Sequence, residues 1–195
     1  MASSKSRQSL IAPSALIHPT AKVGSRTKIW AFCQVAEHAS IGTDCILGNG
    51  VYIDRHVKIG DHVRIHNKAL LYHGVVIEND VFIGPATVFT NDPWPRSGST
   101  RDLKGVSWIV GKGAVIGANV TVLPDVSIGK YATIGAGAVV TKNVPPHTLV
   151  YGNPARFKGY TCTCGYRSLT KTPKKRCPQC KTLWPSLRGF CKKKG

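Results

Sequence analysis

The sequence predicts an all-β protein, a parallel β-helix of short strands, and three observations lead to this fold class. An apolar residue recurs at every sixth position through the first half of the chain. The residue two positions before it is always small or β-branched. Gly, Asn and Asp are concentrated just after it, where turns are needed. Such internal repeats mark solenoids whose coils stack on one another, whereas the i, i+3, i+4, i+7 spacing of an amphipathic helix is absent.

The apolar positions form one continuous column, which we call the anchors. They are Ile17, Val23, Ile29, Val35, Ile41, Leu47, Ile53, Ile59, Ile65, Leu71, Ile77, Ile83 and Phe89. Because alternate residues of a strand share a face, each anchor and the small residue two positions earlier should point inward. Cys33 and Cys45 occupy the small column, so we expect them to be core residues.

The repeat is interrupted once, after Phe89. The chain then runs through a Trp- and Pro-containing segment and a Gly/Ser-rich stretch before the repeat resumes at Val110. A long loop inside a regular solenoid is usually functional, and a tolerated surface insertion is the alternative. We therefore expect a flexible N-terminus at residues 1–10, a β-helix domain at 11–157 with an excursion loop at 92–107, and a small basic tail at 158–195.

The positive charge of the chain is concentrated in that tail. The net charge is +18, and 12 of the 27 Lys and Arg residues lie from position 156 onward, where there is no acidic residue. The tail either binds nucleic acid or adds solubility and attracts an anionic substrate. The lack of a recognised nucleic-acid motif favours the second interpretation. No apolar run approaches a membrane span and no secretory signal is visible, so we expect a cytoplasmic protein.

Four cysteines form two close pairs in the tail: Cys162 with Cys164, and Cys177 with Cys180. Four thiolates so arranged suit a tetrahedral Zn²⁺ ion, and the Cys-Pro-x-Cys turn is a common zinc knuckle. Disulfides are the competing interpretation, which a cytoplasmic location weakens. A closed four-Cys site is structural, and we expect a zinc-ribbon-like unit that is too short to build its own core.

The hexad resembles that of the hexapeptide-repeat acyltransferases, whose left-handed parallel β-helix has three faces and 18 residues per coil. The resemblance implies the handedness and the coil length. With 18 residues per coil, one outward column reads Glu37, Arg55, His73 and Asn91, and ends where the excursion loop leaves the solenoid. This column is the best catalytic constellation in the sequence. His38 and His56 should stack by the same spacing, and so should Asn49 and Asn67.

Longer segments narrow the resemblance. Residues 89–96 (FTNDPWPR) are similar to a segment of sugar-nucleotide N-acetyltransferases, and residues 113–119, 134–146 and 151–156 resemble their acetyl-CoA-binding half. The Cys-x-Cys-Gly and Cys-Pro-x-Cys tail resembles that of enzymes acetylating UDP-2-acetamido-3-amino-2,3-dideoxy-glucuronate. The position of His73 is more often acidic in this family.

The resemblance implies an acetyl-CoA-dependent N-acetyltransferase acting on the 3-amino group of a nucleotide-linked sugar, as a homotrimer with active sites between subunits. Asn91 would bind the amine and His73 would take its proton. The substrate-binding residues would be Arg55, Asn67, Trp94 and Arg96. Those binding the coenzyme would be Gly117, Ala118, Gly135, Ala136, Lys142 and Arg156.

Two alternatives stay open. The first changes the acceptor to a dTDP-3-amino-3,6-dideoxyhexose within the same enzyme class. The second is a γ-type carbonic anhydrase, which also uses a left-handed β-helix but binds zinc through His residues of adjacent subunits, and His62 and His66 suggest it.

Overall fold

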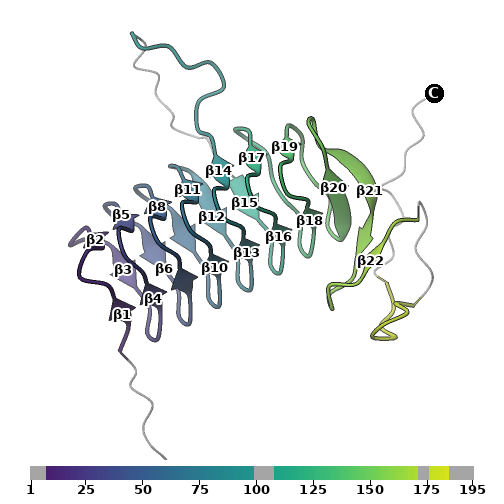
Figure 1. The fold of residues 1–195 in the computed structure, drawn as a ribbon, viewed down its shortest axis with the longest axis horizontal. Coiled ribbons are helices and arrows are strands. Elements are labelled where there is room, and N and C mark those ends of the chain that lie inside the picture. Colours follow the sequence, from purple (N-terminus) through teal and green to yellow (C-terminus); the bar gives the residue numbers. More distant parts are fainter. Residues whose placement is uncertain (1–7, 99–107, 171–175, 185–195) are drawn as a thin grey trace, which may run out of the picture.

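The structure is a computed structural model, and it describes residues 8–98, 108–170 and 176–184. Within these ranges the chain forms 22 short strands and no helix. Figure 1 shows the strands stacked into one elongated solenoid, with the N-terminal coils at one end and a hairpin at the other. The predicted all-β fold class is confirmed. None of the described elements is a helix long and apolar enough to cross a membrane.

The strands form three sheets, which are the three faces of the solenoid. Sheet A contains β1 (Leu10–Ile11), β4 (Lys28–Ile29), β7 (Ile46–Leu47), β10 (Arg64–Ile65), β13 (Phe82–Ile83), β16 (Val115–Ile116), β18 (Thr133–Ile134), β20 (Thr148–Tyr151), β21 (Arg156–Thr161) and β22 (Arg167–Ser168). Sheet B contains β2 (Leu16–Ile17), β5 (Gln34–Val35), β8 (Tyr52–Ile53), β11 (Leu70–Leu71), β14 (Val88–Phe89), β17 (Thr121–Val122) and β19 (Val139–Val140). Sheet C contains β3 (Lys22–Val23), β6 (Ser40–Ile41), β9 (Lys58–Ile59), β12 (Val75–Ile77) and β15 (Trp108–Val110).

The coil repeats every 18 residues, as expected. In the parallel pairing of β8 with β11, for example, Tyr52 lies opposite Leu70 and Ile53 opposite Leu71. The chain passes from sheet A to B to C through three corners, which we call A–B, B–C and C–A. Residues 18 apart therefore occupy the same corner of successive coils.

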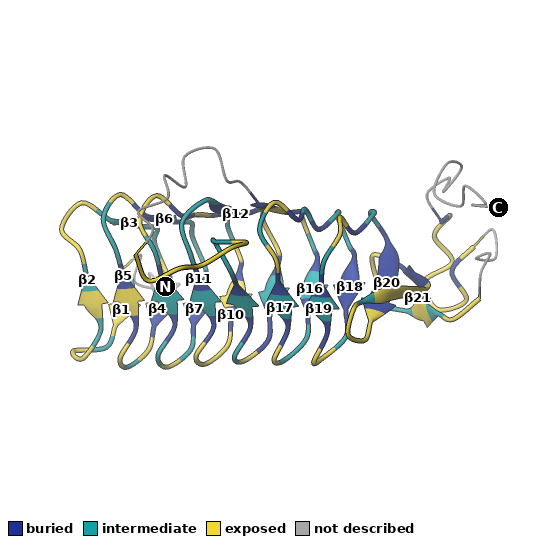
Figure 2. Ribbon diagram, turned by 90° about the horizontal axis from the view of Figure 1, so that it is seen from above, coloured by how far each residue is buried: buried dark blue, intermediate teal, exposed yellow. Residues whose placement is uncertain are grey.

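The anchors and the small column fill the interior. From Ile29 to Phe89 every anchor is buried, and so is every small-column residue from Thr27 to Thr87. Ile17 and Val23 are only partly buried, because no coil covers them from the N-terminal side. Figure 2 shows this gradient, with exposed strands at the N-terminal end and dark, buried β18 and β20 at the other.

Cys33 and Cys45 are core residues, as predicted. Cys33 Sγ donates to the Gly48 carbonyl at 2.9 Å and Cys45 Sγ donates to the Gly60 carbonyl at 3.1 Å. Burial raises the pKa of both thiols, so both stay protonated. The inward hydroxyls of Thr27 and Thr87 make the equivalent bonds to glycine carbonyls, so the small column also links successive turns of the chain.

The excursion loop leaves the solenoid after β14 and returns in β15, at the B–C corner. The register then resumes as predicted, with Val110 opposite Ile77. Residues 99–107 of the predicted loop lie outside the described residues. At the other end, β20 and β21 pair antiparallel and close the solenoid. The domain boundary predicted at 157/158 falls inside β21.

Candidate active site

His73 lies at the B–C corner, two residues after the anchor Leu71. Its ring Nδ1 is 3.0 Å from the carbonyl oxygen of Arg55, one coil earlier. A carbonyl only accepts, so Nδ1 carries the proton of this bond. In the neutral imidazole the lone pair is then on Nε2. The coil below thus orients the His73 ring and leaves Nε2, the nitrogen with the lone pair, outside the bond to Arg55.

Asp54 holds the same corner together, and sequence reasoning missed it. Its Oδ2 accepts the backbone N–H of His73 at 3.0 Å. Its Oδ1 accepts the backbone N–H of Arg55 at 2.7 Å and the hydroxyl of Tyr52 at 3.2 Å. Burial, and next the negative charge of Asp54, raise the pKa of Tyr52, so this hydroxyl remains a donor. One carboxylate therefore holds the backbone of two successive members of the predicted column, Arg55 and His73.

A row of imidazole rings leads up to His73. The rings of His38 and His56 stack with centroids 5.1 Å apart, which confirms the predicted pairing. His56 in turn meets His73 edge-on at 5.8 Å. The His73 ring at the end of this row is fixed in addition by the bond between its Nδ1 and the Arg55 carbonyl.

Asn91 lies one coil above His73, as the spacing predicts, because the anchors Phe89 and Leu71 that precede them are paired. The chain turns away here: the backbone N–H of Thr90 donates to Val122 at 3.0 Å and its hydroxyl donates to the same carbonyl at 3.1 Å. Asn91 is partly buried at the base of the loop.

Trp94 and Arg96 lie further out on this loop. Trp94 is 67% exposed, and its backbone N–H donates to Asp92 Oδ1 at 2.8 Å. The Arg96 side chain is exposed and donates to the carbonyl of Pro95. The loop returns through Trp108, a fully buried residue whose indole N–H donates to the Leu123 carbonyl at 2.8 Å. Trp108 anchors the loop, and sequence reasoning did not single it out.

Asn67 lies at a different corner, A–B, and is not next to His73 within one chain. Its Oδ1 accepts the backbone N–H of Asn49 at 3.0 Å, the cross-coil bond typical of a corner residue. It also lines an open hollow of about 330 Å³ together with Trp30, Arg64 and His66.

The four small residues predicted to contact the coenzyme also lie at the A–B corner. A Cβ on Gly117 would approach the backbone nitrogen of Ala136 to 2.5 Å, and one on Gly135 would approach Cβ of Tyr151 to 2.6 Å. Close stacking of the coils therefore accounts for both glycines. Contact of Gly117, Ala118, Gly135 or Ala136 with a coenzyme stays a prediction.

The structure brings together the two basic residues predicted to bind the coenzyme. Lys142, at the B–C corner of the last coil, and Arg156, on β21, line one cleft of about 490 Å³. Its other walls are largely apolar and include Val144, Phe157 and Tyr160. We call it the hairpin cleft. Two cations and apolar walls suit a ligand that is anionic at one end and apolar along its length.

The four tail cysteines form one cluster, with all four sulfur atoms within 4.8 Å of one another. The Sγ atoms of Cys162 and Cys180 are 3.6 Å apart, and those of Cys164 and Cys177 are 3.7 Å apart. Four sulfurs at about 2.3 Å from a tetrahedral zinc lie roughly 3.8 Å from one another, whereas a disulfide needs about 2.05 Å. The residues fit a zinc ion and not two disulfides.

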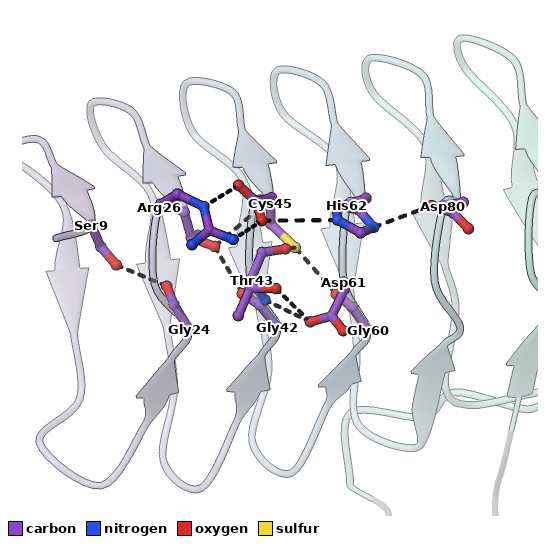
Figure 3. A network of polar contacts seen from close by, with 12 residues as sticks. Ser9, Gly24, Arg26, Gly42, Thr43, Cys45, Gly60, Asp61, His62 and Asp80 are labelled. Atoms are coloured by element: carbon purple, nitrogen blue, oxygen red, sulfur yellow. Dashed lines mark hydrogen bonds and ion pairs between the residues drawn. The ribbon is translucent and has the colours of Figure 1, made fainter. Parts of the chain in front are cut away.

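The histidines that suggested a carbonic anhydrase lie at different corners. His62 is at the C–A corner between two carboxylates, with Nδ1 3.3 Å from Asp80 and Nε2 3.8 Å from Asp44. Figure 3 shows the His62 ring directed toward Asp80 of the next coil. His66 is at the A–B corner and packs on Phe82 at 4.8 Å. In the described part of the chain, the tail cysteines are the only cluster of three or more potential metal ligands. Within one chain, His62 and His66 are therefore not brought together as a pair of zinc ligands.

A parallel β-helix of 18-residue coils, with a cleft of two cations and apolar walls near one end, fits the class of group-transfer enzymes built on this fold. The chain belongs to the bacterial transferase hexapeptide family (six repeats), which it matches over residues 20–55, 56–91 and 109–142. The predicted family is confirmed, and so are its left-handed β-helix fold and the acyltransferase class of enzyme.

Individual relatives differ in acceptor. A dTDP-3-amino-3,6-dideoxy-alpha-D-galactopyranose 3-N-acetyltransferase from Aneurinibacillus thermoaerophilus is 44% identical over 162 residues, 83% of each chain. Serine acetyltransferase 2 from Arabidopsis thaliana is 36% identical over 144 residues, 72% of this chain but 31% of the relative. A crystal structure of PerB from Caulobacter crescentus in complex with CoA and GDP-perosamine is 25% identical with a TM-score of 0.52, over 79% of this chain and 58% of that one. The expected resemblance to sugar-nucleotide N-acetyltransferases is confirmed.

Proposed function

We propose that the protein transfers the acetyl group of acetyl-CoA to the 3-amino group of a nucleotide-linked amino sugar. The observation that carries the proposal is His73, whose Nδ1–H bond to Arg55 leaves Nε2 as acceptor one coil below Asn91. The acceptor class is supported by the 44% identity over most of the chain to a dTDP-3-amino-3,6-dideoxyhexose acetyltransferase. We therefore place the dTDP-linked 3-amino-3,6-dideoxyhexose ahead of the UDP-linked glucuronate as acceptor.

The reaction needs a neutral amine, a positioned thioester and a route for one proton. The amine nitrogen attacks the thioester carbonyl, Nε2 of His73 takes the amine proton, and the C–S bond breaks to release CoA, which takes up a proton as its thiol. The Asn91 carboxamide binds the amine and aligns it. Holding the two reactants at near-attack distance supplies about 7–11 kcal/mol, so alignment contributes more than the base. No covalent acyl-enzyme is required.

We propose that the site is completed by a second subunit of a trimer. Sheet A presents Lys28 and Arg64 outward and sheet C presents Lys22 and Lys58, whereas the strands of sheet B carry no charged residue and their outward face is largely apolar. The residues that make it apolar are Leu16, Tyr52, Leu70, Val88 and Val139. If three copies pack with sheet B toward a common axis, the B–C corner of one subunit meets the A–B corner of the next. That arrangement brings Asn67, Gly117, Ala118, Gly135 and Ala136 of one subunit toward His73 and Asn91 of another.

We assign the hairpin cleft to the coenzyme, with Lys142 and Arg156 facing its phosphates. We also propose one structural zinc ion per chain, held by the four tail cysteines in a closed site without catalytic function. A cytoplasmic location is consistent with these assignments, since none of the six cysteines of the described residues is in a disulfide.

The decisive experiment incubates the protein with acetyl-CoA and a panel of acceptors, and measures the thiol of released CoA. The panel contains dTDP-3-amino-3,6-dideoxyhexoses, the UDP-3-amino-glucuronate and a 4-amino sugar. We expect the first group to be fastest. Release without any acceptor dependence would refute acetyl transfer to a sugar amine, and preference for the UDP-glucuronate would overturn the acceptor chosen here.

Variants test the two proposed residues. Asn91→Ala should lower turnover about a hundredfold, the loss typical of a misaligned reactant, while the trimer mass stays unchanged. His73→Asn should lower turnover by about a hundredfold or more, because the Asn amide offers no nitrogen lone pair where the imidazole has Nε2. The matched control is His38→Asn, two coils away, which should retain parental turnover. Parental turnover in His73→Asn would remove His73 as the base.

A further inference from the structure

β21 belongs to two parts of the molecule at once. Its first residues, Arg156 and Phe157, and its later residue Tyr160 line the hairpin cleft opposite Lys142. The strand ends at Thr161, and the next residue, Cys162, is the first sulfur of the cysteine cluster. β21 therefore connects one wall of the hairpin cleft to the cysteine cluster, so that fixing the cluster also restrains this wall.

Tyr160 is the residue shared by both parts. It is 5% exposed and belongs to a small separate core with Cys162, Cys177 and Trp184. Its ring also meets Phe157 edge-on at 5.0 Å, and both rings line the cleft. The Tyr160 ring therefore packs against the cysteine cluster on one side and forms part of the cleft wall on the other.

The supports of this wall are unequal. On the solenoid side, β20 pairs with β21, and the N–H of Thr161 donates to the carbonyl of His147 at 2.8 Å. On the ribbon side, the N–H of Cys162 donates to the carbonyl of Tyr166 at 2.8 Å, and the buried cluster is only four residues. A core this small does not hold itself together without a cross-link, and the four sulfurs are placed to provide one through a metal ion.

We infer that the cluster of four tail cysteines stabilises one wall of the hairpin cleft, to which we assign the coenzyme. Tyr160 is the positioning residue through which the cluster acts on that wall. The four thiolates, when they share a zinc ion, fix Cys162 and Cys177 beside the Tyr160 ring. That ring then holds Phe157 in the cleft wall. The inference rests on the proposed function in one respect, the assignment of this cleft to CoA.

The test compares the full-length protein loaded with zinc and the same protein stripped by a chelator. Binding of CoA, without acceptor, is measured by calorimetry, and amide hydrogen exchange is measured over residues 156–162. We expect the dissociation constant for CoA to rise about tenfold on stripping, which corresponds to about 1.4 kcal/mol. Exchange over residues 156–162 should accelerate, while that of β16 and β18 in the solenoid stays unchanged. Equal CoA affinity in the two forms would overturn the inference.

Two variants separate the metal from the ring. Tyr160→Ala should keep its zinc yet weaken CoA binding about as much as stripping does. Tyr160→Phe, which keeps the ring, should retain both the zinc content and the CoA affinity of the parent. Cys33→Ser, a core thiol far from the ribbon, is the matched control and should change neither zinc content nor CoA affinity. If even the zinc-loaded protein fails to bind CoA, the proposed function is refuted. Hydrogen exchange alone then tests whether the cysteine cluster stabilises β21, and unchanged exchange in β21 refutes that inference.

Discussion

Replacing Asp54 by Ala should damage the active corner more than the fold. The change removes the acceptor of three hydrogen bonds, from the N–H of Arg55 at 2.7 Å, the N–H of His73 at 3.0 Å and the Tyr52 hydroxyl at 3.2 Å. Water competes at this partly exposed corner, so we take about 1 kcal/mol for each of the two N–H bonds, less than the roughly 1.5–3 kcal/mol of hydrogen bonds to charged groups. The free energy of unfolding should fall by about 2 kcal/mol.

The catalytic effect should be larger than this cost implies. Without Asp54 the backbone of His73 is released, and a displacement of about 1 Å at a reacting group costs roughly a hundredfold in rate. Asp54→Asn is intermediate: it keeps Oδ1 but turns an amide N–H₂ toward the N–H of His73, where two donors meet. The assays are urea unfolding and the turnover number for acetyl transfer.

Asp61→Ala is the matched control at the C–A corner. Asp61 Oδ1 accepts the N–H of Thr43 at 2.7 Å and its hydroxyl at 3.0 Å, so its loss should cost comparable stability. Its corner is not the one proposed for catalysis, and turnover should stay within about twofold of the parent. If Asp54→Ala also loses stability but keeps parental turnover, the claim that Asp54 positions His73 is wrong.

Further predictions concern the coils and pH. Gly117→Ala should cost about 3 kcal/mol or more, since the added Cβ would meet the backbone of Ala136 at 2.5 Å. Gly137→Ala has open space but a φ of +69°, so it should cost only the roughly 1–2 kcal/mol of a left-handed residue. Thermal unfolding compares the two variants, and equal costs would refute the steric reasoning. His147 is buried and burial lowers its pKa, so it contributes stability that is present above about pH 6.5 and lost as the pH falls toward its folded pKa. The melting temperature of His147→Asn should therefore depend less on pH below 6.5 than that of the parent, and parallel curves would contradict this. Hydrogen bonds from Thr43 lower the pKa of Asp61, so this carboxylate contributes stability that is lost as the pH falls below about 4. In Asp61→Ala the free energy of unfolding should therefore fall less steeply below about pH 4 than in the parent. Unfolding measured between about pH 2 and 5 tests this.

The solenoid was predictable because its determinants are side chains at a fixed period. Every inward position repeats with the strand alternation, so burial of Ile53 or Cys45 follows from the pattern alone. The corner column was predictable for the same reason, since the coil length places Asn91 above His73. The role of Asp54 was not, because two of its three partners are backbone N–H groups, which leave no mark in a sequence. An acidic residue after an anchor looks like any turn former.

Asn67 and Tyr160 show two other limits. The side chain of an Asn in a column either binds a ligand or bonds to the next coil, and only the corner and the distance to Asn49 distinguish the two. Tyr160 follows no repeat, and its position depends on an antiparallel hairpin and on a cysteine cluster that are distant in pattern from the hexads. Contacts between unlike parts of a chain are the ones that periodicity does not encode.

The three-cornered coil also limits how this protein can change. An insertion of 18 residues before His73 adds one complete coil and leaves every downstream corner facing as before. An insertion of six residues would turn everything after it by one face, moving the His73 column from the B–C corner to the next. The chain can therefore lengthen only in whole coils, and smaller insertions are confined to places where it already leaves the stack, as it does after Phe89.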